Sequence, residues 1–113
     1  MIADEVRFRL LDMRNHAREA LDIVNGEGIP DRVRALALQR LVSIVGEAAT
    51  RVPTEVRSKV LVIDWRRATG MRHILVHDYA NTNQDTVETT IRRDFPPLIR
   101  ALDDLLSEWG TET

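Results

Sequence analysis

Apolar residues recur at intervals of three and four along most of this chain, the spacing that places them on one face of an α-helix. The first series occupies residues 6–24 and stops at a connection, residues 26–30, that contains two glycines and a proline. The second occupies residues 33–48 and ends before Pro53. Glycine and proline interrupt helices. We therefore predict two long helices joined by a short connection.

The segment after Pro53 predicts a short helical turn or connector and then a third helix. Thr54 suits the start of the turn, which we expect to reach about Val60. The third helix is predicted from about Asp64 or Trp65 to His77, despite the low helix propensity of the glycine within it.

A last apolar face predicts the C-terminal helix. Its members are Val87, Ile91, Phe95, Leu98, Leu102, Leu105 and Leu106. Pro96 and Pro97 lie inside this series, and because proline lacks an N–H and crowds the preceding turn, we expect a kink or a break there. No segment alternates like a strand. The predicted fold is all-α, an up-and-down bundle of four main helices with a kinked or broken C-terminal helix.

The composition is that of one globular domain, residues 1–113. Hydrophobic residues make up 43% of the chain and charged residues 30%, and there is no cysteine. The lack of cysteine excludes disulfides, thiolate metal sites and cysteine nucleophiles. The N-terminus lacks the order of a signal peptide, and no apolar run has the length of a membrane span. We expect a soluble, cytoplasmic protein that does not contact membranes.

The charge is distributed unevenly along the chain. Residues 51–73 carry six basic and two acidic side chains, a net charge of +4, although the whole chain has a net charge of −2. A basic zone attracts a phosphate backbone, and it is also typical of a solvated helix surface. Arg66 and Arg67 are the candidates for RNA contact within it.

Some apolar residues lie outside the single faces of the first two helices. They are Phe8, Leu11, Leu38 and Val42. Such positions are buried either against a second copy of the chain or in a broad core stripe, and the pattern alone permits both.

Residues 70–79 contain the candidate chemistry. Arg72 and His77 are separated by four residues, and Tyr79 follows two beyond the histidine. Arginine binds phosphate oxygens through a planar fork, and histidine transfers protons near neutral pH. On an ideal helix Arg72 and His77 are about 140° apart, so one helix alone makes an awkward site. A helix end near His77, or a second copy, would bring such groups together.

Three neighbours of this pair have alternative interpretations. His73 and His77 are spaced like two metal ligands on a helix, but the glutamate of that motif and a third ligand are missing, so we predict no metal site. His73 is expected to support the motif or contact RNA. Asp78 either orients His77 or is an exposed acid at a helix end. Tyr79 packs its ring, assists RNA binding or accepts a modification.

The segment resembles the R-x4-H-x-Y signature of the HEPN superfamily, in its HepT-like toxin branch. Residues 63–66 followed by 70–72 resemble the Trp-Arg lead-in of that family, and residues 37–49 resemble its second helix. Residues 94–98 resemble its acidic, proline-containing last helix. Two positions depart from the family: His73 stands where many members have Asn, and Glu88 follows Val87 where an aromatic residue is frequent.

The resemblance implies a toxin that cleaves RNA without a metal or cofactor, in a type VII-like toxin–antitoxin system. His77 would move the proton and Arg72 would stabilise charge on the phosphorus. The family implies a homodimer with facing motifs. It also implies a partner, a minimal nucleotidyltransferase antitoxin that transfers AMP to the motif tyrosine, here Tyr79. The alternative is a non-catalytic helical subunit that binds nucleotide or protein as the partner of a nucleotidyltransferase.

Overall fold

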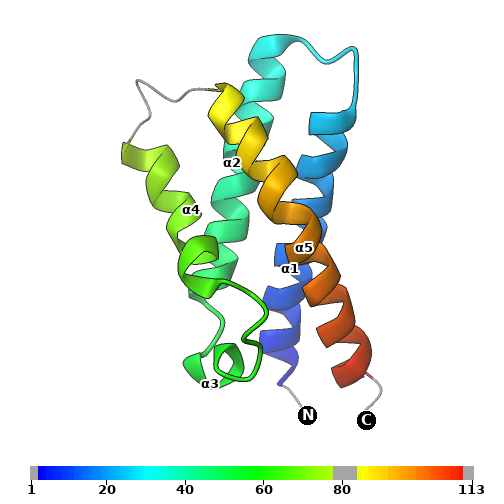
Figure 1. The fold of residues 1–113 in the computed structure, drawn as a ribbon, viewed down its shortest axis with the longest axis vertical. Helices are drawn as coiled ribbons and strands as arrows, with labels where there is room; N and C mark the ends of the chain where they lie inside the picture. Colours follow the sequence, from blue (N-terminus) through cyan, green and yellow to red (C-terminus); the bar gives the residue numbers. More distant parts are fainter. Residues whose placement is uncertain (1–2, 78–83, 111–113) are drawn as a thin grey trace.

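The computed structural model describes residues 3–77 and 84–110, without the side chains of residues 72–77, 109 and 110. The helices in this part of the chain are α1 (Asp4–Asn25), α2 (Asp31–Thr50), α3 (Thr54–Arg57), α4 (Trp65–His77) and α5 (Gln84–Gly110). No strand occurs within the described ranges. The long helices alternate in direction, and α1 begins where α5 ends (Figure 1). The predicted all-α bundle with four main helices is confirmed.

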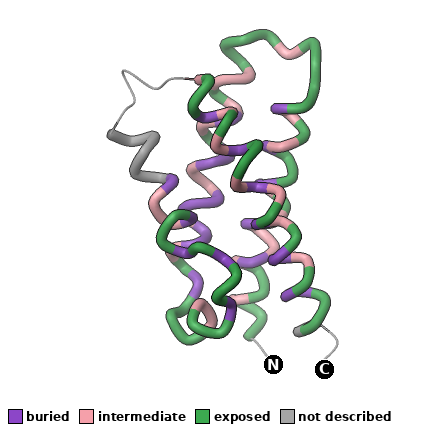
Figure 2. The backbone as a smooth tube through the Cα atoms, viewed as in Figure 1, coloured by how far each residue is buried: buried purple, intermediate pink, exposed green. Residues whose placement is uncertain are grey.

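Helix α2 is the element on which the others assemble. It packs against α1 and α4 and, less extensively, against α5, while α5 packs chiefly against α1. The buried positions of the tube in Figure 2 accordingly lie on the faces that the helices turn toward one another. The bundle is elongated, with dimensions of 44 × 28 × 21 Å. Helix α4 is thus held mainly through its contacts with α2.

The buried faces agree with the sequence pattern for α1 and α5 and differ from it at the start of α2. All seven predicted positions of α5 are buried, and Phe95 and Ile91 are fully enclosed. On α2, Val33 and Leu36 were expected on the core face but are 54% and 50% exposed. On an ideal helix both positions fall outside the arc of the buried residues of α2, so their side chains lie on the solvent face.

The apolar residues that were candidates for contact with a second copy of the chain divide into buried and exposed ones. Leu38 and Val42 are 0% and 5% exposed, so they belong to the core of this chain and provide no surface for a partner. Leu11 is half-buried against the same core. Phe8 is 68% exposed. The broad-stripe interpretation therefore holds for α2, and only Phe8 remains open on α1.

Helix α5 continues through Pro96 and Pro97 without a break. Of the two alternatives predicted there, a break is therefore wrong. The prolines cannot donate hydrogen bonds to the carbonyls one turn earlier. Phe95 and Leu98, which flank the prolines, are both buried. Packing on either side thus holds the helix through a sequence that local propensity would interrupt.

Arginines from neighbouring segments bind the C-terminal ends of α1 and α2, and neither helix has a basic residue of its own in the last turn. Arg34 Nη1 donates to the carbonyl of Ile23 at 2.7 Å, and its Nη2 donates to that of Val24 at 2.7 Å. Arg57 donates to the carbonyls of Ala49, Thr50 and Val52 at 2.8–3.1 Å. Terminal carbonyls lack partners within their own helix and carry partial negative charge, so these cations stabilise both ends.

Leu38→Ala should lower the free energy of unfolding by about 2–5 kcal/mol, because it opens a cavity in the fully buried face of α2. The matched control is Leu61→Ala, since Leu61 is 84% exposed in the connection before α4. The control should change stability by no more than about 0.5 kcal/mol. Urea unfolding followed by circular dichroism measures both, and equal losses would contradict the burial assignment.

Candidate functional site

Helix α4 carries most of the candidate residues, and two local interactions define its start. Asp64 Oδ1 accepts a hydrogen bond from the backbone N–H of Arg67 at 3.0 Å, the geometry of an N-cap. Trp65 Nε1 donates to the carbonyl of Val60 at 3.0 Å, which ties the helix to the preceding connection. Val60 lies beyond the short helix α3, which ends at Arg57. The predicted start of the third helix is confirmed.

One face of α4 fixes the helix to the bundle. Trp65, Ala68 and Met71 are all buried and follow one another at intervals of three residues. Arg66 and Arg67 lie outside this buried series and are exposed. The register of the helix is therefore determined by its apolar residues, and the charged ones are left at the surface.

The predicted catalytic pair lies in the second half of α4. Arg72, His73 and His77 all belong to this helix, which ends at His77. Their side chains, together with residues Asp78 and Tyr79, lie outside the described part of the structure. Both members of the pair thus stand on one continuous helix, and the roles predicted for them and for their neighbours stay predictions.

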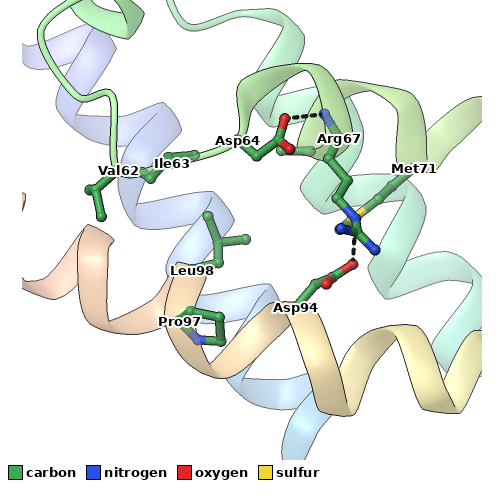
Figure 3. A pocket seen from close by; sticks show the side chains of 9 residues that line it. Val62, Ile63, Asp64, Arg67, Met71, Asp94, Pro97 and Leu98 are labelled. Carbon is green, nitrogen blue, oxygen red and sulfur yellow. Dashed lines mark hydrogen bonds and ion pairs between the residues drawn. The ribbon is translucent and has the colours of Figure 1, made fainter.

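Arg67 connects α4 to α5. Its Nε lies 3.1 Å from Oδ2 of Asp94, a side chain that is only 12% exposed (Figure 3). Arg93 pairs with the same carboxylate at 3.0 Å. Val62, Ile63, Met71 and Leu98 help to line a hollow of about 150 Å³ beside this pair. Since the charge of Arg67 is already opposed by Asp94, it is less available for RNA than the sequence predicted.

The basic zone divides into structural and free cations. Arg57 holds the end of α2 and Arg67 pairs with Asp94. Arg51, the residue that follows α2, has its Nε 3.6 Å from Oε1 of Glu47. Arg66 is exposed, and its side chain makes no hydrogen bond or ion pair within the described ranges. Among the arginines predicted to contact RNA, Arg66 is therefore the one with an unopposed charge.

A second charged cluster fixes the start of α5, just beyond the motif segment. Arg34 Nη2 and Nε donate to Oε1 and Oε2 of Glu88 at 2.7 and 3.2 Å, while the same guanidinium holds the end of α1. Gln84 Nε2 also donates to Glu88, at 3.3 Å. The hydrogen bond from Arg34 lowers the pKa of Glu88, and the same bond raises the pKa of Arg34.

This cluster explains the first of two residues whose importance the sequence did not reveal. Glu88 departs from the family pattern at a position expected to pack, yet here it joins α5 to α1 and α2 through Arg34. Asp94 was noted only as part of an acidic segment. For both Glu88 and Asp94, the available signal was a charged residue within an otherwise apolar helical face. Each one binds an arginine on another helix, which local spacing could not identify.

Metal-ligating side chains do not gather in the described part of the chain. No group of three or more His, Cys, Asp or Glu side chains is close enough there to hold an ion. The described helices also include none with the length and apolarity needed to cross a membrane.

The family model described as "Ribonuclease HepT-like" matches residues 11–105, a range that includes all of α4. This chain belongs to the HepT-like ribonuclease family. The HepT-like relatives include a protein of Caldanaerobacter subterraneus subsp. tengcongensis named "Putative RNase", which is 31% identical over 80 residues, 71% of each chain. A "Putative RNase" of Methanocaldococcus jannaschii is 26% identical over 98 residues, 83% of this chain and 90% of the relative.

A third HepT-like relative is the "Probable ribonuclease HepT" of Thermococcus cleftensis. It is 29% identical over 68 residues, which are 60% of this chain and 62% of the relative. No solved structure matches this chain significantly. The family assigned from the residues of the motif is confirmed.

Glu88→Gln should make the free energy of unfolding depend less on pH in the acidic range. Because the pKa of Glu88 is lowered in the folded protein, the stabilisation by its charge is present above the unfolded pKa, about 4.5, and is lost as the pH falls through the folded pKa. Wild type should therefore be more stable than Glu88→Gln at pH 7, and the difference should shrink below about pH 4.5. Urea unfolding of both proteins at pH 7 and below about pH 4.5 measures this difference in stability.

Glu19→Gln is the control, because it removes an exposed carboxylate from α1. A stability difference between wild type and Glu88→Gln that stays constant from pH 7 to about pH 3 would show that the ion pair does not stabilise the fold.

Proposed function

We propose that this protein is a metal-independent endoribonuclease whose catalytic groups are Arg72 and His77. The observation that supports this most strongly is the family match, which spans residues 11–105 and therefore the whole helix that carries both residues. The relatives whose names include ribonuclease are consistent with RNA as the substrate class.

The reaction follows from the chemistry of the two side chains. The 2′-hydroxyl of the ribose attacks the adjacent phosphorus, forms a bond to it and displaces the 5′ oxygen of the next nucleotide. His77 accepts the proton of the hydroxyl or delivers one to the leaving oxygen, as a group that titrates near neutral pH can. Arg72 binds the oxygens on which negative charge develops. DNA lacks the attacking hydroxyl and should resist cleavage.

The biological role that we propose is that of the toxin in a type VII-like toxin–antitoxin pair, acting in the cytoplasm. The partner is a minimal nucleotidyltransferase that transfers AMP to Tyr79, two residues beyond His77. An AMP group brings a negative phosphate and considerable bulk next to Arg72 and His77. The modification would thus occupy the space that the substrate phosphate needs.

We also propose that the active form is a homodimer, in which the motifs of the two chains face one cleft. Leu38 and Val42 are not part of such an interface, because they are buried within one chain. The exposed apolar side chain of Phe8 on α1 favours an apolar contact of α1 with another surface.

His77→Ala should abolish cleavage of RNA in buffer that contains EDTA, because the proton carrier is lost, while the helical content stays unchanged. A gel assay with a labelled RNA oligonucleotide and far-ultraviolet circular dichroism measure these two properties. His16→Ala is the matched control: His16 lies on α1, where its Nδ1 is 2.7 Å from the carbonyl oxygen of Asp12. Full activity of His77→Ala, or activity that requires added metal, contradicts the mechanism. Inactive wild-type protein would favour the non-catalytic alternative.

Tyr79→Phe should abolish modification by a cognate nucleotidyltransferase, because the acceptor hydroxyl is removed. Tyr79 is the only tyrosine of the chain, so this one substitution removes every phenolic acceptor. Co-expression of wild type with the active partner should raise the intact mass by whole AMP increments and stop RNA cleavage. If Tyr79→Phe keeps the full increment, the acceptor is another residue. An unchanged wild-type mass would instead indicate inhibition by complex formation.

A further inference from the structure

Gly70 occupies a position in α4 where the chain itself does not require a glycine. A Cβ atom built at Gly70 meets no atom within 4 Å, and the backbone there has an ordinary helical conformation. A glycine inside a helix lowers stability relative to alanine, because it restricts more backbone freedom on folding. Neither packing nor backbone geometry within this chain explains the residue.

The surroundings of Gly70 are open and basic. A hollow over this part of α4 is lined by Gly70, Arg66, Arg67 and Asp64. Asp64 accepts the backbone N–H of Arg67, and Arg67 is opposed by Asp94. The cation left for a ligand is Arg66, which lies one helical turn before Gly70. The side chain of Arg66 makes no hydrogen bond or ion pair within the described ranges.

The helical register relates this surface to the proposed catalytic histidine. Positions 66, 70, 73 and 77 follow at intervals of four, three and four, so they fall on one face of α4. Position 70 precedes position 77 by about 10 Å along the helix axis. The backbone of an extended RNA strand that follows this face would pass Arg66 and Gly70 before it reaches position 77.

We infer that Gly70 and Arg66 form a subsite for an RNA backbone phosphate that flanks the cleaved one. Arg66 binds the phosphate oxygens, and the missing side chain at Gly70 lets the strand approach the helix closely. This inference rests on the proposed ribonuclease function and adds the path of the substrate along α4. A second copy of the chain is a less favourable occupant, because it would bury the unpaired charge of Arg66.

Direct binding of RNA tests the subsite independently of cleavage. The probe is a fluorescent 2′-O-methyl RNA oligonucleotide of mixed sequence, which keeps the phosphates but lacks the attacking hydroxyl. Gly70→Ala should raise the thermal unfolding midpoint by a few degrees, because helix propensity increases without a clash. The same variant should weaken binding of the probe by roughly fivefold, measured by fluorescence anisotropy.

The salt dependence of binding separates the two members of the subsite. Arg66→Gln should also weaken binding and should reduce the slope of log affinity against log salt by roughly 0.7, the value for one lost contact to a single strand. Gly70→Ala should leave that slope unchanged, since it removes no charge. Ser107→Ala on α5 controls for helix propensity and Arg7→Gln on α1 controls for charge, because both are exposed residues of helices other than α4.

Several results would overturn the inference. One is an unchanged affinity of Gly70→Ala for the probe, and another is a lower unfolding midpoint of that variant. A third is a mass of Gly70→Ala in light scattering that is half that of wild type, which would assign Gly70 to contact with a second copy. Weaker probe binding by both variants, alongside a wild type that does not cleave RNA, would show that the two residues bind a backbone phosphate and would overturn its place beside a cleaved one, together with the ribonuclease proposal. Failure of the two proposals can thus be distinguished.

Discussion

Helix α2 has to satisfy three neighbours at once, and this requirement determines the rest of the bundle. Its buried positions, which include Leu38, Val42, Gly46 and Ala48, span an arc of roughly 160° on an ideal helix. A surface helix with a single partner needs an apolar stripe of about 100°. The additional width lets α1 and α4 pack against α2 from different directions. Because α4 has its main contact with α2, the position of the motif helix depends on this arc.

Charged residues at the helix ends add further contacts between helices that already pack through their apolar faces. Arg34 lies on α2, but its guanidinium holds the last carbonyls of α1 and the carboxylate of Glu88 on α5. One side chain therefore joins three helices at the end of the bundle where α5 starts. At the other end Arg57 holds the last turn of α2, close to the connection that leads to α4. Arginines thus hold the end of α2, before the motif helix, and the first turns of α5, after it.

The sequence predicts those features that depend on local spacing. The start of α4 at Trp65 and the buried face of α5 follow from helical periodicity. Tertiary effects account for the failures. Val33 and Leu36 belong to the apolar series of α2 but lie outside its buried arc, and the packing of Phe95 and Leu98 carries α5 through two prolines. The partners of Arg34 and Asp94 lie on other helices, so no spacing rule could identify them.

The register of α4 places a physical demand on any site built from Arg72 and His77. Position 72 lies four residues beyond the buried Ala68 and seven beyond Trp65, so it continues the face that packs on the bundle. On an ideal helix position 77 instead falls on the same side as position 66 and position 70. Two groups about 140° apart on a rigid helix cannot reach one phosphate from its middle. They can meet only past the last turn of the helix, or in a cleft to which a second chain contributes. The first solution would place the chemistry at the end of α4, and the second would place it between two chains.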